Sequence, residues 1–218
     1  MRTLFLLLFV PFISGNAQNK INTSDKVNNA DAVSPLSDFS EEWNDAKYMA
    51  CNTAATANYM NEEEKNVIWV LNLARMNPKL FCSTVVKKYP EFSDNAELVN
   101  ITYYQSLITT MNTMKKQNML QPDSDCFASA QCHAYNSGVS GYTGHERSGP
   151  CNTNQYYNGE CCDYGHGNAL DIVMSLLIDY DVPSLGHRTA CFSPYKTIGV
   201  SIQPHKIYDT NTVLDFHF

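Results

Sequence analysis

Apolar residues recur at helical spacing in five stretches of the chain. The first begins at Asn61, which can cap a helix, and Glu64 stands three residues later, where a capping box requires it. Its apolar stripe repeats every three or four residues as far as Ala74. The other predicted helices cover about residues 80–86, 103–117, 126–140 and 169–178. The last of them follows a possible cap at Asn168 and is apolar almost all round, which predicts a central helix.

Strand patterns occur late in the chain. Residues 197–202 are rich in β-branched side chains, and residues 212–218 alternate so that Val213 and Leu214 face opposite ways. Residues 205–211 between them predict a hairpin turn. Helices followed by late antiparallel strands predict an α+β domain.

The N-terminal residues have the pattern of a processing signal. A positive start, an apolar run from Leu4 to Ile13 and small residues before Gln18 predict a signal peptide over 1–17 and a secreted protein. Residues 18–45 are polar and predict a flexible lead-in, followed by one domain over 46–218. No later run approaches the roughly 18 apolar residues of a membrane span, so we expect no membrane anchor.

The charge argues against one class of partner. The formal net charge is −7, and the basic residues form only isolated pairs such as Lys87-Lys88. Without a basic patch there is little attraction for phosphates, so we expect no nucleic-acid partner.

The chain has eight cysteines, all after the predicted signal peptide. An even number in a secreted protein predicts disulfides, although the sequence leaves the pairing open. The adjacent Cys161 and Cys162 are expected to pair with different partners, and Cys151 with either of them would close a loop of about ten residues. A cysteine zinc site is the weaker alternative, because the chain has no Cys-x-x-Cys pair.

Three short motifs surround the predicted central helix. They are Gly144-His145, Gly159-Glu160 and Gly186-His187-Arg188, and the strand sequence Ile-Gly-Val-Ser-Ile follows at 198–202. In this order the motifs resemble the CAP superfamily of cysteine-rich secretory proteins, venom allergens and pathogenesis-related proteins. The similarity covers about 61–218, and residues 176–188 resemble the bacterial branch. It implies an α-β-α sandwich of the CAP (SCP-like) type.

The resemblance also implies a cleft with two histidines and two acidic residues. His145, Glu160 and His187 match three of these positions. Asp179 stands near the position of the second glutamate, with Asp181 as an alternative. The chain departs from the family at Cys161, where an asparagine normally follows the glutamate.

Two imidazoles and two carboxylates can do several kinds of chemistry. His145 and His187 could hold a divalent metal ion such as Zn²⁺ or Mg²⁺, or the cluster could act in acid–base catalysis. The set could equally be a buried polar network that only holds the fold. His166 is a further candidate for the rim of the cleft. His133 is expected to be structural or exposed, and His205 and His217 are expected at the ends of strands.

The sequence shows no motif typical of a catalytic nucleophile. Ser184 lies near His187 but lacks a Gly-x-Ser-x-Gly motif, so the catalytic residues stay unassigned. Three functions therefore remain. The resemblance implies a secreted extracellular protein that binds a lipid, a sterol or a peptide. A metal-dependent hydrolase using His145, Glu160, Asp179 and His187 is the second. A disulfide-stabilised module that binds another extracellular protein is the third.

Overall fold

The computed structural model describes residues 33–153 and 155–218, so the predicted signal peptide lies outside the described residues. The described helices, helical turns and strands are, in chain order, η2 (Glu41–Asn44), α1 (Ala46–Met49), α2 (Glu62–Met76), α3 (Pro78–Phe81), the π-helical η3 (Cys82–Val86), α4 (Tyr89–Phe92), η4 (Ala96–Asn100), α5 (Thr102–Thr113), β1 (Gln121–Pro122), α6 (Ser124–Ser140), η5 (Gly149–Asn152), β2 (Gly159–Tyr164), α7 (Ala169–Ile178), α8 (Gly186–Phe192), β3 (Thr197–His205) and β4 (Asp209–His217).

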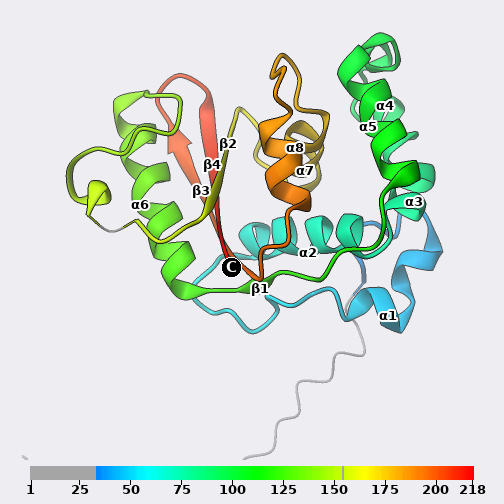
Figure 1. Ribbon diagram of the computed structural model, residues 1–218, viewed down its shortest axis with the longest axis horizontal. Coiled ribbons are helices and arrows are strands. Elements are labelled where there is room, and N and C mark those ends of the chain that lie inside the picture. The colour runs from blue at the N-terminus through cyan, green and yellow to red at the C-terminus, as the bar shows by residue number, and fades with distance from the viewer. Residues whose placement is uncertain (1–32, 154) are drawn as a thin grey trace, which may run out of the picture. The chain divides into compact units, whose positions relative to one another are not determined.

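The strands form one mixed sheet in the order β1-β3-β4-β2. β1 is parallel to β3, and the other two neighbouring pairs are antiparallel. Helix α6 packs on β3 and β4, whereas α2, α7 and α8 pack against the sheet from the other side (Figure 1). The predicted α+β class with late antiparallel strands is therefore confirmed.

Successive side chains of β4 point to opposite faces of the sheet, one packed against α6 and the other against α2, α7 and α8. Leu214 and Phe216 join the large core formed with α2, α7 and α8, while Val213 packs with Ala130 and Ala134 of α6. The predicted opposite facing of Val213 and Leu214 is confirmed. The same alternation in β2, a strand that the hydropathy pattern did not predict, places Cys161 in the large core and Cys162 on the α6 side.

Local capping signals predicted the helix starts correctly. Asn61 accepts from the Glu64 amide, and Glu64 accepts from the Asn61 amide, which completes the capping box of α2. Asn168 likewise accepts from the Asp171 amide at the start of α7. α5 ends earlier than predicted, because the following segment bonds to α2 through Leu120 N–H and the Asn72 side chain.

Gly138 lies inside α6, within the predicted helix 126–140. The helix continues to Ser140, and Gly141 caps it in the left-handed conformation. A Cβ atom on Gly138 would lie 2.1 Å from the Pro204 carbonyl oxygen, so glycine is needed where α6 approaches β3. β3 itself runs through Pro204 to His205, which makes the hairpin turn shorter than the predicted 205–211.

The described part of the predicted lead-in belongs to the folded domain. Leu36, Phe39 and Trp43 are buried in the main core. The Trp43 indole N–H donates to the Thr84 hydroxyl at 3.1 Å. The domain therefore includes residue 33 onward, earlier than the predicted boundary at 46.

The cysteines form one disulfide bond among the described residues. Cys132 of α6 is bonded to Cys151 of η5, and the remaining cysteines are buried free thiols: Cys51, Cys82, Cys126, Cys161, Cys162 and Cys191. The sequence left the partner of Cys151 open, and the short loop to Cys161 or Cys162 that it allowed is not closed. The chain folds back over α6 before it reaches β2, so Cys151 meets the helix first.

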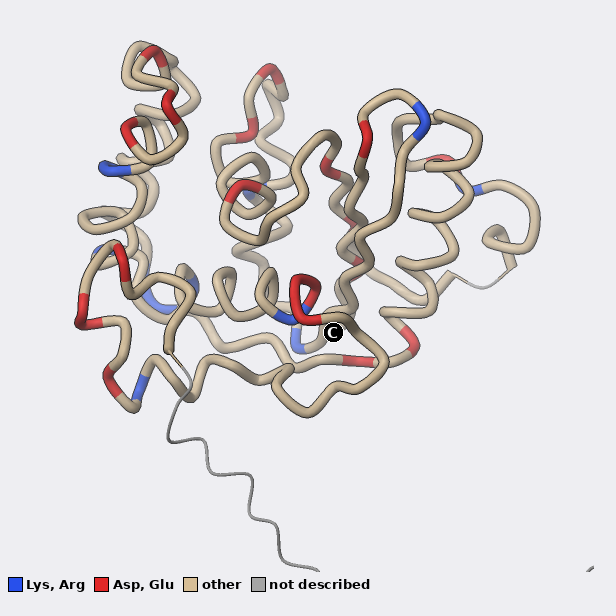
Figure 2. Tube along the Cα trace, turned by 180° about the vertical axis from the view of Figure 1, so that it is seen from behind, with Lys and Arg blue, Asp and Glu red and all other residues tan. Residues whose placement is uncertain are grey.

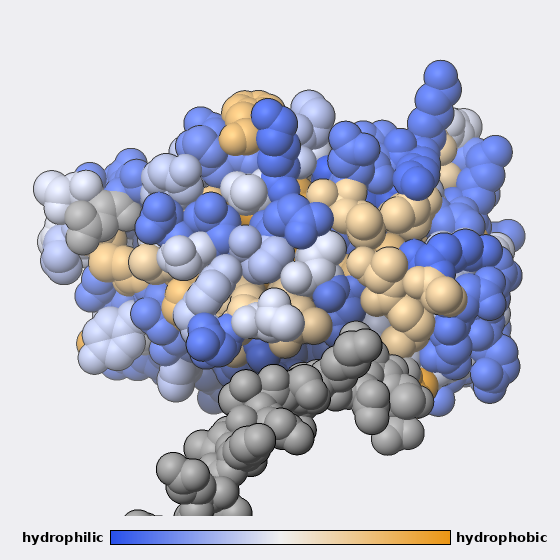
Figure 3. Space-filling view, turned by 90° about the horizontal axis from the view of Figure 1, so that it is seen from below, coloured by the Kyte–Doolittle hydropathy of each residue, from blue (hydrophilic) through white to orange (hydrophobic). Residues whose placement is uncertain are grey.

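The surface carries scattered charge. Figure 2 shows the Lys and Arg residues of the described chain spread apart. The face seen in Figure 3 is largely hydrophilic, with smaller groups of apolar residues between. Among the described residues, no helix has both the length and the apolar character needed to cross a membrane.

Candidate functional site

The loop after α6 and strand β2 bring His145 and Glu160 together. His145 Nδ1 lies 2.7 Å from Glu160 Oε1. A carboxylate can only accept, so Nδ1 carries the proton and Nε2 is the free ring nitrogen. The side chain of Glu160 is 4% exposed and that of His145 is 58% exposed. In this pair the carboxylate of Glu160 is buried and the imidazole ring of His145 is accessible to solvent.

A buried charge network lies behind this pair. Arg147 Nη2 bonds Glu160 Oε2 and also donates to both carboxylate oxygens of Asp215 at 2.8 Å. Arg147 Nη1 donates to the Ser129 carbonyl at 2.7 Å, and the guanidinium lies 4.4 Å from the centre of the Tyr157 ring. The network explains how a carboxylate as buried as Glu160 stays charged.

The pKa shifts follow from these contacts. Burial works to raise the pKa of Glu160, but the hydrogen bond with His145 and the charge of Arg147 outweigh it, so the pKa is lowered. The hydrogen bond to Glu160 raises the pKa of His145. Burial raises the pKa of Asp215 to about 7, against the lowering effect of Arg147.

His187 and Asp179 form a second pair built differently. Asp179 ends α7 in the left-handed conformation, with φ 58°, and its Oδ1 lies 2.8 Å from His187 Nδ1. Its other oxygen accepts from the Arg188 backbone N–H at 3.1 Å. Asp181, the alternative in the sequence, is exposed. Asp179 is therefore the partner of His187.

The two pairs meet at their histidines. The ring centroids of His145 and His187 are 6.1 Å apart, and both rings have Nδ1 occupied by a carboxylate. A zinc ion about 2.1 Å from an imidazole nitrogen lies about 3.2 Å from the ring centroid, so a centroid separation of 6.1 Å would suit one ion placed between two Nε2 atoms that face it. A carboxylate on the other nitrogen is the usual support of a metal-binding histidine. The four residues predicted from the sequence thus come together, and their chemistry fits a divalent metal ion.

A second group could also hold a metal ion. Ligand atoms of His133, Glu160 and Cys162 lie within 4.8 Å of one another. Glu160 already bonds His145 and Arg147, and burial raises the pKa of the Cys162 thiol well above its ordinary value. Metal binding here would have to displace those partners and deprotonate the thiol.

The sequence did not single out this group, although one signal was present. Glu160 and Cys162 are two residues apart, which is the spacing of one face of a strand. His133 is buried in α6, and its Nε2 lies 2.9 Å from the Gly144 carbonyl oxygen. Cys132, which precedes it, is in the disulfide. The strand at 159–164 had to be recognised before this juxtaposition could be predicted.

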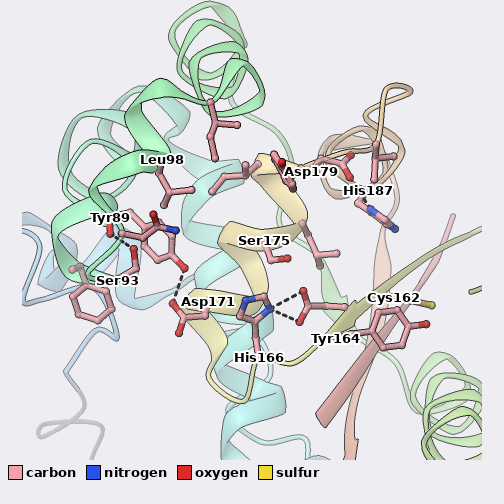
Figure 4. A pocket seen from close by; sticks show the side chains of 18 of the residues that line it. Tyr89, Ser93, Leu98, Cys162, Tyr164, His166, Asp171, Ser175, Asp179 and His187 are labelled. Atoms are coloured by element: carbon pink, nitrogen blue, oxygen red, sulfur yellow. Dashed lines mark hydrogen bonds and ion pairs between the residues drawn. The ribbon is translucent and has the colours of Figure 1, made fainter. Parts of the chain in front are cut away.

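A groove of about 910 Å³ leads away from the second pair. Asp171, Ser175 and Asp179, spaced four residues apart, line it along α7 (Figure 4). Tyr89 and Leu98 lie on one side of this row, and His166 and His187 lie towards its two ends (Figure 4). The groove therefore extends from the His187–Asp179 pair along a long surface of mixed polarity.

The groove contains a further histidine–aspartate pair. His166 Nδ1 lies 3.0 Å from Asp163 Oδ2, and this hydrogen bond raises the pKa of His166. On the other side the Tyr89 hydroxyl donates to Asp171 at 2.7 Å. His166 thus lines the same groove as His187, whereas His205 and His217 end strands β3 and β4 as expected.

The two arginines near the predicted site are structural. Arg147 pairs with Glu160 and Asp215 as described above. Arg188 Nε donates to the Leu177 carbonyl at 2.6 Å, and its Nη2 donates to those of Ile178 and Tyr103. Arg188 thus closes the carboxyl end of α7, which fixes the backbone on which Asp179 sits.

Comparison of the chain with protein-family models, with curated proteins and with solved structures gives no match.

Proposed function

We propose that the protein is a secreted CAP-type binding protein whose His145 and His187 hold a divalent metal ion at one end of a ligand groove. The observation that carries this proposal is the 6.1 Å separation of two imidazoles that are each supported by a carboxylate. The order of the motifs and the helices on both faces of the sheet support the family assignment.

Zinc is the ion that this donor set favours. Imidazole nitrogen suits Zn²⁺, whereas Mg²⁺ prefers oxygen ligands. A bound zinc ion supplies Lewis acidity and an acidic water. The chain's own part is to hold both rings in one tautomer through Glu160 and Asp179, which leaves the two Nε2 atoms free to bind.

The groove limits the chemistry of its ligand. Among the described residues its lining includes four aspartates and no Lys or Arg, together with aromatic and aliphatic side chains. Such a surface repels anions and offers acceptors to N–H groups. It therefore favours an extended peptide that is neutral or positively charged. A sterol or a neutral lipid is the alternative ligand, and an acidic lipid is disfavoured.

The Cys132–Cys151 disulfide supports the assignment to a secreted protein, because such bonds persist in oxidising compartments.

Hydrolysis is the second candidate, and one observation favours it. His187 and His166 both line the groove, and each has its Nδ1 held by an aspartate. A histidine oriented in this way can act as a general base through its free nitrogen. A peptide held along the groove would be the substrate.

The test is a zinc titration by calorimetry on metal-stripped protein. We expect saturable binding by the wild type and none by His145→Ala or His187→Ala. His166→Ala is the matched control, since it removes a histidine of the same groove that also pairs with an aspartate. Asp179→Asn keeps a residue that tolerates the left-handed backbone and should weaken binding by about 10- to 100-fold.

Two results would overturn the metal proposal. One is unchanged zinc affinity in both alanine variants, and the other is the absence of zinc binding by the folded wild type. Circular dichroism of each variant separates loss of binding from loss of fold. If folded alanine variants lose only stability, the cluster holds the fold, which favours the interaction module.

A further inference from the structure

Two buried cysteines meet between the elements that carry the two halves of the site. Cys161 follows Glu160 in β2, and Cys191 stands one helical turn after His187 in α8. Both cysteines are fully buried and belong to the same core. α8 packs against β2, so the two residues lie on elements that are in contact.

The contacts of Cys161 place its sulfur against this helical turn. Cys161 Sγ lies 3.7 Å from the His187 carbonyl oxygen, the acceptor of the helical bond that Cys191 N–H makes in α8. Burial, followed by a hydrogen bond to the Cys191 thiol, raises the pKa of Cys161 well above its ordinary value. The two thiols are thus near neighbours in the fold, although 30 sequence positions separate them.

The neighbouring Cys162 does not share this position. It packs on the α6 side of the sheet with Ala130 and Ala134, and its sulfur lies 3.7 Å from His145 Nδ1. Strand alternation therefore separates two adjacent cysteines into different environments. Only Cys161 faces α8.

We propose that Cys161 and Cys191 are a redox-active pair that forms a second disulfide in the mature protein. The oxidant is a small-molecule disulfide such as oxidised glutathione. Attack by one cysteine thiolate on that disulfide releases one small thiol and leaves a mixed disulfide. The second cysteine thiolate then displaces the other small thiol, so the protein loses two hydrogen atoms and the oxidant becomes two thiols. Because both thiols are buried, this exchange takes place during folding or when α8 opens.

The bond would join the two histidine–carboxylate pairs through their own backbone. β2 carries Glu160 directly before Cys161, and α8 carries His187 one turn before Cys191. A covalent link between these elements restricts their separation. It would therefore preorganise the approach of His145 and His187 without contacting either ring.

The experiment is a disulfide map of the full chain refolded in a glutathione redox buffer without metal. Free thiols are trapped with N-ethylmaleimide, and the non-reduced peptides are fragmented to locate the linked residues. We expect a Cys161–Cys191 peptide beside Cys132–Cys151, so that the free thiols fall from six to four. The absence of metal makes the result independent of the proposed metal centre.

Two single variants distinguish the adjacent cysteines. Cys162→Ser should keep the link to Cys191, and Cys161→Ser should abolish it. A stability readout uses the Cys132→Ser/Cys151→Ser background, in which reduction should lower Tm by about 10 °C through loss of the proposed bond. Adding Cys191→Ser should remove that shift.

The outcomes are distinct. N-ethylmaleimide on both Cys161 and Cys191 while Cys132–Cys151 is formed would overturn the proposal. A Cys162–Cys191 bond in the wild type would overturn it as well. Because the wild-type map alone decides between these results, a variant that fails to fold does not affect the conclusion.

Discussion

The two histidine–carboxylate pairs place similar chemistry on different supports. Glu160 is held by the side chain of Arg147, which also bonds the buried Asp215. Asp179 is held by a backbone N–H and by its position at the end of α7. The first pair depends on balanced buried charges, and the second depends on backbone geometry. Equal function at the two rings therefore does not imply equal tolerance of mutation.

The largest difference in the free energy of unfolding is expected when the two arginines, Arg147 and Arg188, are replaced. Arg147→Met leaves Glu160 and Asp215 buried without their cation, which should lower the free energy of unfolding by about 3–5 kcal/mol. Arg188→Met removes bonds to backbone carbonyls and a hydroxyl, which should cost about 1–3 kcal/mol. Urea unfolding of both variants measures these free energies. Equal losses of stability in the two variants would contradict the proposed difference between the charge-based and the backbone-based support.

A smaller difference is expected when each carboxylate is made neutral. Glu160→Gln leaves Arg147 with one counter-charge and should cost about 2 kcal/mol, whereas Asp179→Asn keeps an acceptor for the backbone N–H and should cost about 1 kcal/mol. The unfolding midpoints of the two variants, compared in the same buffer, provide the measurement. A reversed order would show that the backbone support is the weaker one.

The smallest effect concerns pH. The folded pKa of His145 is raised by Glu160, so its contribution to stability is present below about pH 6.5 and is lost as the pH rises through the folded value. The decrease in Tm over this range should be smaller in His145→Gln. Because the ring is more than half exposed, added salt should weaken the effect. His217→Gln is the control, and an unchanged pH slope in His145→Gln would exclude this contribution.

Local signals carried most of what could be predicted. The capping box at Asn61 and Glu64 and the cap at Asn168 involve residues three positions apart, so the sequence contains the whole interaction. His145, Glu160, Asp179 and His187 were proposed as one cluster because the order of the short motifs resembles the CAP superfamily. Strand β2 was missed by the hydropathy pattern because its Gly-Glu-Cys-Cys-Asp-Tyr sequence lacks β-branched residues.

Long-range contacts could not be predicted in the same way. The partner of Cys151 depends on how the chain returns over α6, which no spacing rule gives. The choice between Asp179 and Asp181 depends on where α7 ends, because both residues have positive φ and only Asp179 is buried against His187. The burial of Trp43 likewise required the core that later residues provide.

The row formed by Asp171, Ser175 and Asp179 also sets a length for the peptide ligand that we propose. Asp171 and Asp179 are eight positions apart, which corresponds to about 12 Å along a helix. An extended peptide covers that span with about four residues, since each advances the chain by about 3.3 Å. A peptide bound along the whole row from Asp171 to Asp179 would therefore contain at least about four residues, and a single amino acid is too short to cover that row.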